Sequence, residues 1–244
     1  MTKLVEDRDP PFDTIVFDCD STLSFIEGIE ELFPDESPEL DQLTNAAMNG
    51  DVPLEAVYGR RLEIAQPTAD AVLEVGQRYI ETALPHAKEL IQGLQTLGKR
   101  VVIVSGGLLP AVAVFGRALG LADEDIIAVD IYFDNEGQYA GFEENSPVAR
   151  AGGKLELLGE FPETDAIALI GDGATDLEAA PACARFIAFG GVEKRERVFS
   201  AARVHTEEPD LAALLPLLLS PDEIERLETL PDHADLMVAA RPFL

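Results

Sequence analysis

Cysteine, basic side chains and long hydrophobic runs are all scarce in this sequence of 244 residues. The two cysteines, Cys19 and Cys183, cannot build a disulfide framework, and no cysteine or histidine spacing typical of a metal site is present. A reducing compartment, the cytoplasm, is therefore the expected location. The longest apolar run, Leu211 to Leu219, is interrupted by Pro216 and is too short to span a bilayer. The charged stretch from Met1 to Pro11 does not resemble a signal peptide.

Acidic residues far outnumber basic ones: 46 Asp and Glu against 18 Lys and Arg give a formal net charge of −28. This balance excludes a nucleic-acid-binding protein, because a phosphate backbone needs a basic surface, and it disfavours docking on anionic lipid. A phosphorylated small molecule would have to meet the few basic groups, or a metal ion, inside a pocket. The 5 lysines against 13 arginines fit either adaptation to high salt or an ordinary acidic surface; an apolar fraction of 47% favours the second.

Short runs of β-branched and aromatic residues predict buried strands, and helical patterns separate them. Continuously apolar strands that alternate with helices are typical of a parallel sheet covered on both faces. We therefore predict a Rossmann-like α/β fold. The strands are expected at residues 13–18, 101–105, 126–130, 166–170, 185–189 and 203–205, and the helices at 87–97, 108–119, 153–160, from 175, and 192–201.

The stretch 23–81 contains no strand candidate and about four helical pieces punctuated by prolines. We interpret it as a helical cap domain inserted into an α/β core made of residues 1–22 and 82–244. Within the core, the polar turn Asp134–Gly137 predicts a small hairpin near residues 131–142. The acidic tail after Ser220 is expected to form one or two helices.

Polar groups follow several predicted strands, at the sheet edge where open α/β proteins bind ligands. Asp18 and Asp20 point to the same side of an extended chain, so their repulsion calls for a cation or a proton-transfer role. The alternative is a pair of acids that cap a following helix. Ser105-Gly106-Gly107 offers a hydroxyl and backbone N–H groups to an anion, although a plain strand–helix turn would look alike.

Two further features complete this set of polar groups. Lys154 follows Gly152-Gly153 and opens a predicted helix; taken alone it would be an ordinary surface lysine. Asp172 and Asp176 add two carboxylates in the run from Gly171 to Asp176, next to glycines that allow close approach of the backbone.

These four features match, in order, the motifs of the haloacid dehalogenase-like phosphatase superfamily, and the chain from about Phe12 to Leu215 resembles its phosphoserine phosphatase branch. The acidic tail lies outside the resemblance. Segments that carry the finer resemblance are Glu27–Leu32, Ala47–Gly50, Arg61-Leu62 through Gln66-Pro67, Tyr139–Phe142 and Gly171–Ala179.

The resemblance implies Mg²⁺-dependent hydrolysis of phosphoserine, the last step of L-serine biosynthesis, through an aspartyl-phosphate. Asp18 would be the nucleophile and Asp20 the general acid and base. Hard oxygen ligands for Mg²⁺ would come from Asp18, Asp172 and the backbone carbonyl of Asp20, with Asp176 as a support behind them. The residues expected to bind the phosphate are Ser105, Gly106, Lys154 and Thr175.

In the cap, the resemblance implies that Glu27 meets the substrate ammonium and Arg61 its carboxylate, with Met48 near the substrate stem. Taken singly, these two charges would be a helix N-terminal acid and a surface arginine. Leu54 and the Leu84-Pro85-His86 turn depart from the family pattern, so the pocket shape is less determined than the chemistry. Cys19 and Cys183 are expected to pack in the core.

Two alternatives stay open from sequence. The same chemistry could act on another small phosphomonoester, or transfer the phosphoryl group to an alcohol such as homoserine. A catalytically inactive relative used for binding would usually lack a motif acid, and none is missing here. The chain is expected to be a monomer or a homodimer.

Overall fold

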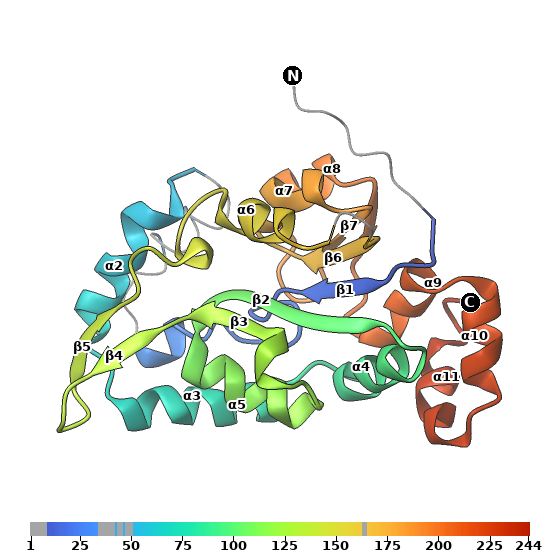
Figure 1. Ribbon diagram of the computed structural model, residues 1–244, viewed down its shortest axis with the longest axis horizontal. Helices are drawn as coiled ribbons and strands as arrows, with labels where there is room; N and C mark the ends of the chain where they lie inside the picture. The colour runs from blue at the N-terminus through green and yellow to red at the C-terminus, as the bar shows by residue number, and fades with distance from the viewer. Residues whose placement is uncertain (1–8, 34–41, 43–45, 47–50, 163–164) are drawn as a thin grey trace.

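A parallel six-stranded sheet forms the centre of the molecule in the computed structural model, which describes residues 9–33, 42, 46, 51–162 and 165–244 (Figure 1). The strand order is β3-β2-β1-β6-β7-β8, so the sheet grows outwards from β1 in both directions. All six predicted strands are confirmed. Their bounds are β1 Thr14–Phe17, β2 Arg100–Leu108, β3 Ile126–Val129, β6 Ile167–Gly171, β7 Arg185–Phe189 and β8 Val204–Thr206.

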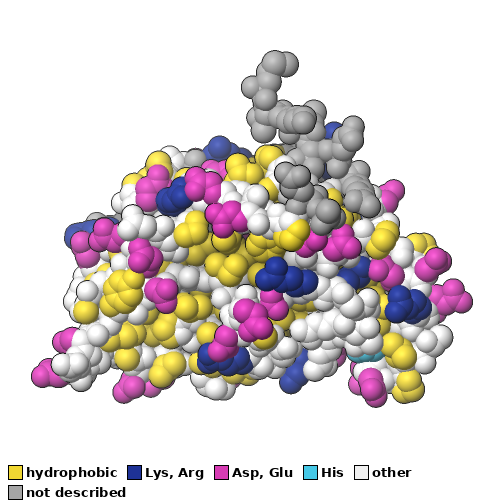
Figure 2. Space-filling view, viewed as in Figure 1, with side chains coloured by type: hydrophobic (Ala, Val, Ile, Leu, Met, Phe, Trp, Pro, Cys, Tyr) yellow, Lys and Arg dark blue, Asp and Glu magenta, His cyan; other side chains and the backbone are white. Residues whose placement is uncertain are grey.

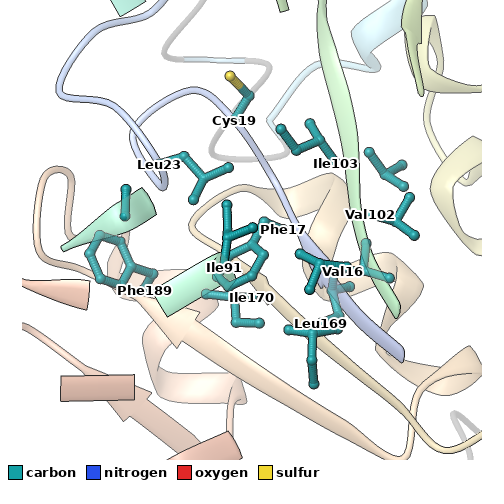
Figure 3. Packing of buried hydrophobic residues seen from close by; sticks show 14 of the residues in the cluster. Val16, Phe17, Cys19, Leu23, Ile91, Val102, Ile103, Leu169, Ile170 and Phe189 are labelled. Carbon is teal, nitrogen blue, oxygen red and sulfur yellow. The ribbon is translucent and has the colours of Figure 1, made fainter. Parts of the chain in front are cut away.

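Helices cover both faces of this sheet, as predicted (Figure 1). On one face lie α3 (Ala69–Glu81), α4 (Ala87–Thr96) and α5 (Leu109–Leu119). On the other face lie α6 (Gly153–Gly159), α7 (Ala174–Ala179) and α8 (Glu196–Ala201). The helices exclude solvent from the central strand, since all four residues of β1 are buried. Figure 3 shows how layers of the core meet, with labelled side chains from β1, β2, β6 and α4: Val16, Phe17, Val102, Ile103, Leu169, Ile170 and Ile91.

Two predicted boundaries were wrong. β2 does not end at Ser105 but continues to Leu108, with a shift in its register against β3 between Val104 and Leu108. The glycines after Ser105 therefore belong to an irregular strand end and not to a plain turn. The helix expected from residue 192 begins at Glu196, because Arg195 is extended and its guanidinium reaches across to Asp172. A tertiary contact overrides the local helical pattern there.

The predicted cap stretch contains a short 3₁₀ turn (Glu30–Leu32), α2 (Leu54–Ala65) and α3, and Ser24 forms an isolated bridge with Ala83. α3 packs directly on the core helix α5. Gly76 allows this close approach, since an added Cβ would lie 2.7 Å from Cβ of Val114. The limits of the cap at residues 23 and 81 stay a prediction.

The hairpin predicted near residues 131–142 is confirmed as β4 (Ile131–Phe133) and β5 (Tyr139–Phe142). It extends beyond the sheet alongside α2 (Figure 1). Phe142 packs its ring on Tyr58 of α2, with the centroids 5.2 Å apart. The hairpin therefore forms a wall beside the carboxyl ends of the strands.

The tail after Ser220 is helical, as predicted: α10 (Pro221–Glu228) is followed by a 3₁₀ turn (Pro231–His233) and α11 (Ala234–Ala240). It follows the short helix α9 (Leu215–Leu218), at the end of the molecule away from α2 (Figure 1). Buried Lys99 donates to the carbonyl of Phe12 (2.8 Å) and to Oε1 of Glu223 (2.6 Å), which ties α10 to the amino ends of β1 and β2.

The described residues contain no helix that is both long and apolar enough to cross a membrane. Carboxylate side chains are spread over the face shown in Figure 2, between patches of hydrophobic side chains.

Candidate active site

The register of the central strands brings the first and fourth motifs together. Phe17 pairs with Ile170, so β1 and β6 end level with each other. Asp18 follows β1 directly, and Asp172 follows β6 directly. Thr22 connects the two loops, since its hydroxyl donates to Oδ1 of Asp172 (3.3 Å). The two carboxylates therefore meet at the point where the strand order reverses, which is where α/β sheets bind ligands.

Lys154 is buried in this carboxylate cluster. Its Nζ lies 2.6 Å from Oδ1 of Asp176 and 3.1 Å from Oδ1 of Asp18, and its side chain is 3% exposed. The interpretation as a surface lysine is therefore wrong. Burial alone would lower the pKa of Lys154, but the carboxylates of Asp176 and Asp18 raise it above its ordinary value, so the ammonium stays charged.

Carboxylate oxygens of Asp18, Asp172 and Asp176 all lie within 4.8 Å of one another. This set of hard oxygen donors fits a divalent cation such as Mg²⁺. Both oxygens of Asp176 already accept hydrogen bonds, from Lys154 (2.6 Å) and from the N–H of Gly173 (3.0 Å). Both oxygens of Asp172 accept hydrogen bonds as well, from Thr22 (3.3 Å) and from Arg195 (2.9 Å), so hydrogen bonding does not distinguish direct ligands from supporting groups within this set.

The loop after β1 holds Asp20 by one of its two oxygens. Oδ1 of Asp20 accepts from the N–H of Gly28 (2.7 Å) and from the hydroxyl of Tyr79 (2.5 Å). Asp20 is therefore bonded to a loop N–H and to a phenol, and it does not cap a following helix, which was the alternative interpretation. Burial and the charge of Asp18 raise the pKa of Asp20 to about 6, although Tyr79 and Gly28 lower it. A carboxyl with that pKa can both give and take a proton near neutrality.

The glycine-rich end of β2 forms another wall of the site. Ser105 is fully buried, and its Oγ accepts the N–H of Gly107 (2.9 Å). The carbonyl of Gly106 accepts the hydroxyl of Tyr58 (2.7 Å). Tyr58 thereby links α2 to the strand end, and both Gly106 and Tyr58 line the pocket described next.

One pocket collects groups from the core and from the predicted cap. Its core-side residues include Asp18, Asp20 and Lys154, and its cap-side residues include Glu27 and Arg61. The complete lining is Asp18, Asp20, Glu27, Ile29, Leu54, Tyr58, Arg61, Gly106, Val148, Lys154 and Thr175. Met48, expected near the substrate stem, lies outside the described residues.

Arg61 is 2% exposed although it carries a full charge, so it is not the surface arginine considered above. Among the described residues, its Nε has no hydrogen-bond partner. A buried donor without a partner is costly, so its position in the pocket wall points to an anionic ligand. Glu27 accepts from the hydroxyl of Ser21 (2.8 Å). Burial, together with Asp20 and Asp172, raises the pKa of Glu27 well above its ordinary value.

Arg195 belongs to the site but was missed by the sequence analysis. Its Nε donates to Oδ2 of Asp172 (2.9 Å), and its terminal nitrogen lies 3.4 Å from Oε1 of Glu27. The guanidinium therefore connects the carboxylate of Asp172 to Glu27 on the cap side. No local motif marks Arg195. The helical pattern of residues 192–201 assigns it to a helix, whereas in the structure it lies just before the short helix α8.

Two tyrosines were also missed, Tyr58 and Tyr79. Both lie on the buried faces of helices, among apolar residues that helical periodicity places in the core. The signal that could have found them is the tyrosine itself: a buried phenol needs a hydrogen-bond partner, whereas leucine or phenylalanine does not.

The Leu84-Pro85-His86 departure has a structural explanation. His86 adopts a left-handed conformation (φ 59°) at the start of α4, a conformation that usually favours glycine. Its Nδ1 lies 2.8 Å from Oδ1 of Asp210, which anchors the ring. The departure therefore alters a turn, and His86 does not belong to the pocket lining.

Both cysteines are free and buried in the hydrophobic core, as predicted. Cys19 lies between Asp18 and Asp20, and burial together with these carboxylates raises the pKa of its thiol well above the ordinary value. The thiol is therefore not a candidate nucleophile.

Comparison with known proteins agrees with this geometry. The model of the haloacid dehalogenase-like hydrolase family matches residues 12–183. The chain is 37% identical to the phosphoserine phosphatase of Homo sapiens over 200 residues, which cover 78% of this chain and 87% of the relative. It is 36% identical to the phosphoserine phosphatase of Bos taurus over 191 residues, 76% of this chain and 85% of the relative.

Solved structures show the same likeness. A phospho-aspartyl intermediate analogue of phosphoserine phosphatase superimposes with a TM-score of 0.71 at 26% identity, covering 86% of this chain and 100% of that chain. A substrate-bound phosphoserine phosphatase complex gives a TM-score of 0.70 at 25% identity, with the same coverage.

Proposed function

Because this chain belongs to the haloacid dehalogenase-like hydrolase family, we propose that it is the phosphatase that hydrolyses O-phospho-L-serine to L-serine and phosphate, the last step of L-serine biosynthesis. The observation that carries the choice of substrate is buried Arg61, which lines the pocket that also contains Asp18 and whose Nε has no hydrogen-bond partner among the described residues. A substrate with a carboxylate next to its phosphate would give this guanidinium a partner.

Phosphatases of this family work through an aspartyl-phosphate, and we assign the attacking group to Asp18. Its Oδ1 is held by the N–H of Cys19 (2.8 Å) and by Lys154 (3.1 Å), so Oδ2 is the oxygen assigned to attack on phosphorus. The bond from phosphorus to the serine oxygen breaks as the bond to Asp18 forms. Hydrolysis of the acyl phosphate then regenerates the carboxylate.

Asp20 would protonate the departing serine oxygen and then take a proton from the water that attacks the intermediate. Since its Oδ1 is engaged by Gly28 and Tyr79, Oδ2 is the oxygen assigned to this proton transfer. A single carboxyl serves both steps because the proton it loses in the first step is recovered in the second.

The site supplies positive charge inside a protein whose net charge is strongly negative. Lys154, Gly106, Ser105 and Thr175 would hold the phosphate oxygens. A Mg²⁺ ion held by Asp18, Asp172 and the carbonyl of Asp20 would neutralise part of the phosphate charge and of the Asp18 carboxylate. In this way a chain with a net charge of −28 can bind a dianion.

The cap side would recognise the amino-acid part of the substrate. We assign the carboxylate to Arg61 and the ammonium to Glu27, which would then be ionised in the complex. Met48 would pack near the substrate stem. The pocket supports a small-molecule substrate, and the two free, buried cysteines support a cytoplasmic location. A monomeric or homodimeric state completes the proposal.

Phosphoryl transfer to homoserine is the second candidate function, because Leu54, which departs from the family pattern, forms part of the pocket wall. Incubation with phosphoserine and homoserine separates the two reactions. We expect free phosphate to equal the serine released, with no phosphohomoserine detected by mass spectrometry. Phosphohomoserine as the main phosphorylated product would replace the proposal by a transferase.

Removal of divalent metal should abolish activity, and Mg²⁺ should restore it. Ca²⁺ should inhibit, since its longer bonds and higher coordination number favour binding of both oxygens of Asp18. Both expectations are tested by measuring phosphate release first in the presence of a chelator and then after adding each ion. In a binding readout, Mg²⁺ should raise the melting temperature of the wild type but not of Asp172→Asn. Full activity in chelator would contradict the assignment of these carboxylates.

A further inference from the structure

We propose that Tyr79 is a positioning residue that orients the carboxyl of Asp20 for protonation of the leaving oxygen. The inference rests on the proposed function, because it concerns the step in which the serine oxygen leaves phosphorus. It concerns a residue outside the four motifs, on a helix of the predicted cap.

The contact geometry determines which oxygen of Asp20 is left to react. The hydroxyl of Tyr79 and the N–H of Gly28 both donate to Oδ1, at 2.5 Å and 2.7 Å. Two donors on one oxygen restrict the rotation of the carboxyl. Oδ2 then lies on the other side, where a Cβ built on Gly107 would be 3.4 Å from it. Asp20 lines the pocket, and of its two oxygens Oδ2 is the one that Tyr79 and Gly28 do not engage.

Tyr79 itself is held rigidly. It is completely buried on α3, and its ring stacks on Phe115 of α5 with centroids 5.5 Å apart and planes 13° apart. Gly28 lies against the hydroxyl: a Cβ at that position would be 1.9 Å from the phenol oxygen. Since the ring is fixed by the core helix α5, the hydroxyl provides a reference point for Asp20 that does not depend on the loop after β1.

The alternative is a purely structural role, in which the buried hydroxyl of Tyr79 donates to Asp20 because it is the nearest acceptor, with no effect on the reaction. The two interpretations differ in what the hydroxyl does when the bond from phosphorus to oxygen breaks. At that moment Asp20 passes its proton from Oδ2 to the serine oxygen and becomes a carboxylate. A donor on Oδ1 keeps Oδ2 directed at the leaving group and stabilises the new negative charge.

This role matters only where the leaving group needs a proton. A serine alkoxide leaves poorly without one, whereas 4-nitrophenolate leaves as a stable anion. The ratio kcat/KM reports the first phosphoryl transfer in both cases. A misplaced general acid should therefore affect phosphoserine and spare 4-nitrophenyl phosphate, while a damaged fold should affect both substrates equally.

The test is Tyr79→Phe, which removes the hydroxyl and keeps the ring on Phe115. We expect kcat/KM for phosphoserine to fall about ten- to hundredfold, with a change under about threefold for 4-nitrophenyl phosphate. The loss on phosphoserine should disappear in an Asp20→Asn background, because Tyr79 acts through that carboxyl. Equal losses on the two substrates, no loss, or a loss that persists in Asp20→Asn would overturn the inference.

Tyr58→Phe is the matched control, since it also removes one buried hydroxyl of this pocket, bonded to the carbonyl of Gly106 and not to Asp20. Any loss that it causes on phosphoserine should be unchanged in the Asp20→Asn background, because Tyr58 does not act through that carboxyl. If Tyr79→Phe is not recovered folded, Gly28→Ala displaces the same hydroxyl and should give the same split. If the wild type hydrolyses another alkyl phosphate but not phosphoserine, the proposed function fails, and the same comparison on that substrate still decides the role of Tyr79.

Discussion

Replacing Asp18 by asparagine should lower kcat for phosphoserine by at least about three orders of magnitude while the protein stays folded. Covalent catalysis loses its attacking oxygen, and an amide cannot form the acyl phosphate. The fold should tolerate the change because the amide oxygen can still accept the N–H of Cys19, and Lys154 keeps its contact with Asp176. Phosphate release and the melting temperature, measured on the same preparation, check both halves of the expectation.

Asp13→Asn is the matched control. Asp13 precedes the same strand at its opposite end and accepts the N–H of Ala166 there. The substitution removes the same charge far from the pocket, so activity should stay at the wild-type level. Retention of a tenth of the activity by Asp18→Asn would contradict the assignment of the nucleophile.

Arg61→Ala should lower kcat/KM for phosphoserine about thirty- to thousandfold. The substitution leaves the substrate carboxylate desolvated and unpaired, at a cost of roughly 2–4 kcal/mol, and each 1.4 kcal/mol is about a factor of ten. Glu27→Gln should act in the same direction on the ammonium. We expect Arg61→Ala to be the more damaging, because a guanidinium–carboxylate pair has more hydrogen bonds to lose.

An aryl phosphate carries neither the carboxylate nor the ammonium, so its hydrolysis should change far less in both variants. Arg60→Ala is the matched control: it is the neighbouring arginine of α2, its side chain is 60% exposed, and it pairs with Glu63 on the surface. Parallel losses on both substrates would mean that Arg61 and Glu27 maintain the fold or the catalytic groups. No loss on either would mean that the substrate is a different phosphomonoester.

The sheet could be predicted because each strand is a short run of apolar residues that ends in polar groups. Buried parallel strands leave no solvated face, so their pattern is continuous and easily recognised. The end of β2 could not be predicted in the same way. Gly106 and Gly107 are typical of a turn. The strand continues through them because it pairs with β3 and because Tyr58 donates to the carbonyl of Gly106.

Motif residues such as Asp18 and Asp172 could be predicted as neighbours because they follow paired strands. Their surroundings could not. The ion pair between Arg195 and Asp172 joins residues on different loops, and only the packed structure brings them together. The burial of Arg61 likewise depends on how α2 packs against the strand ends and the hairpin, which local sequence does not encode.

The most direct test of the proposed function compares three substrates of the wild type with Mg²⁺ present: O-phospho-L-serine, O-phosphoethanolamine and 3-phosphoglycerate. The second lacks the carboxylate that Arg61 would bind, and the third lacks the ammonium that Glu27 would bind. With both charges engaged in the pocket, kcat/KM for phosphoserine should exceed each of the others by about thirtyfold or more. Values for either compound that equal or exceed that for phosphoserine would contradict the proposed substrate.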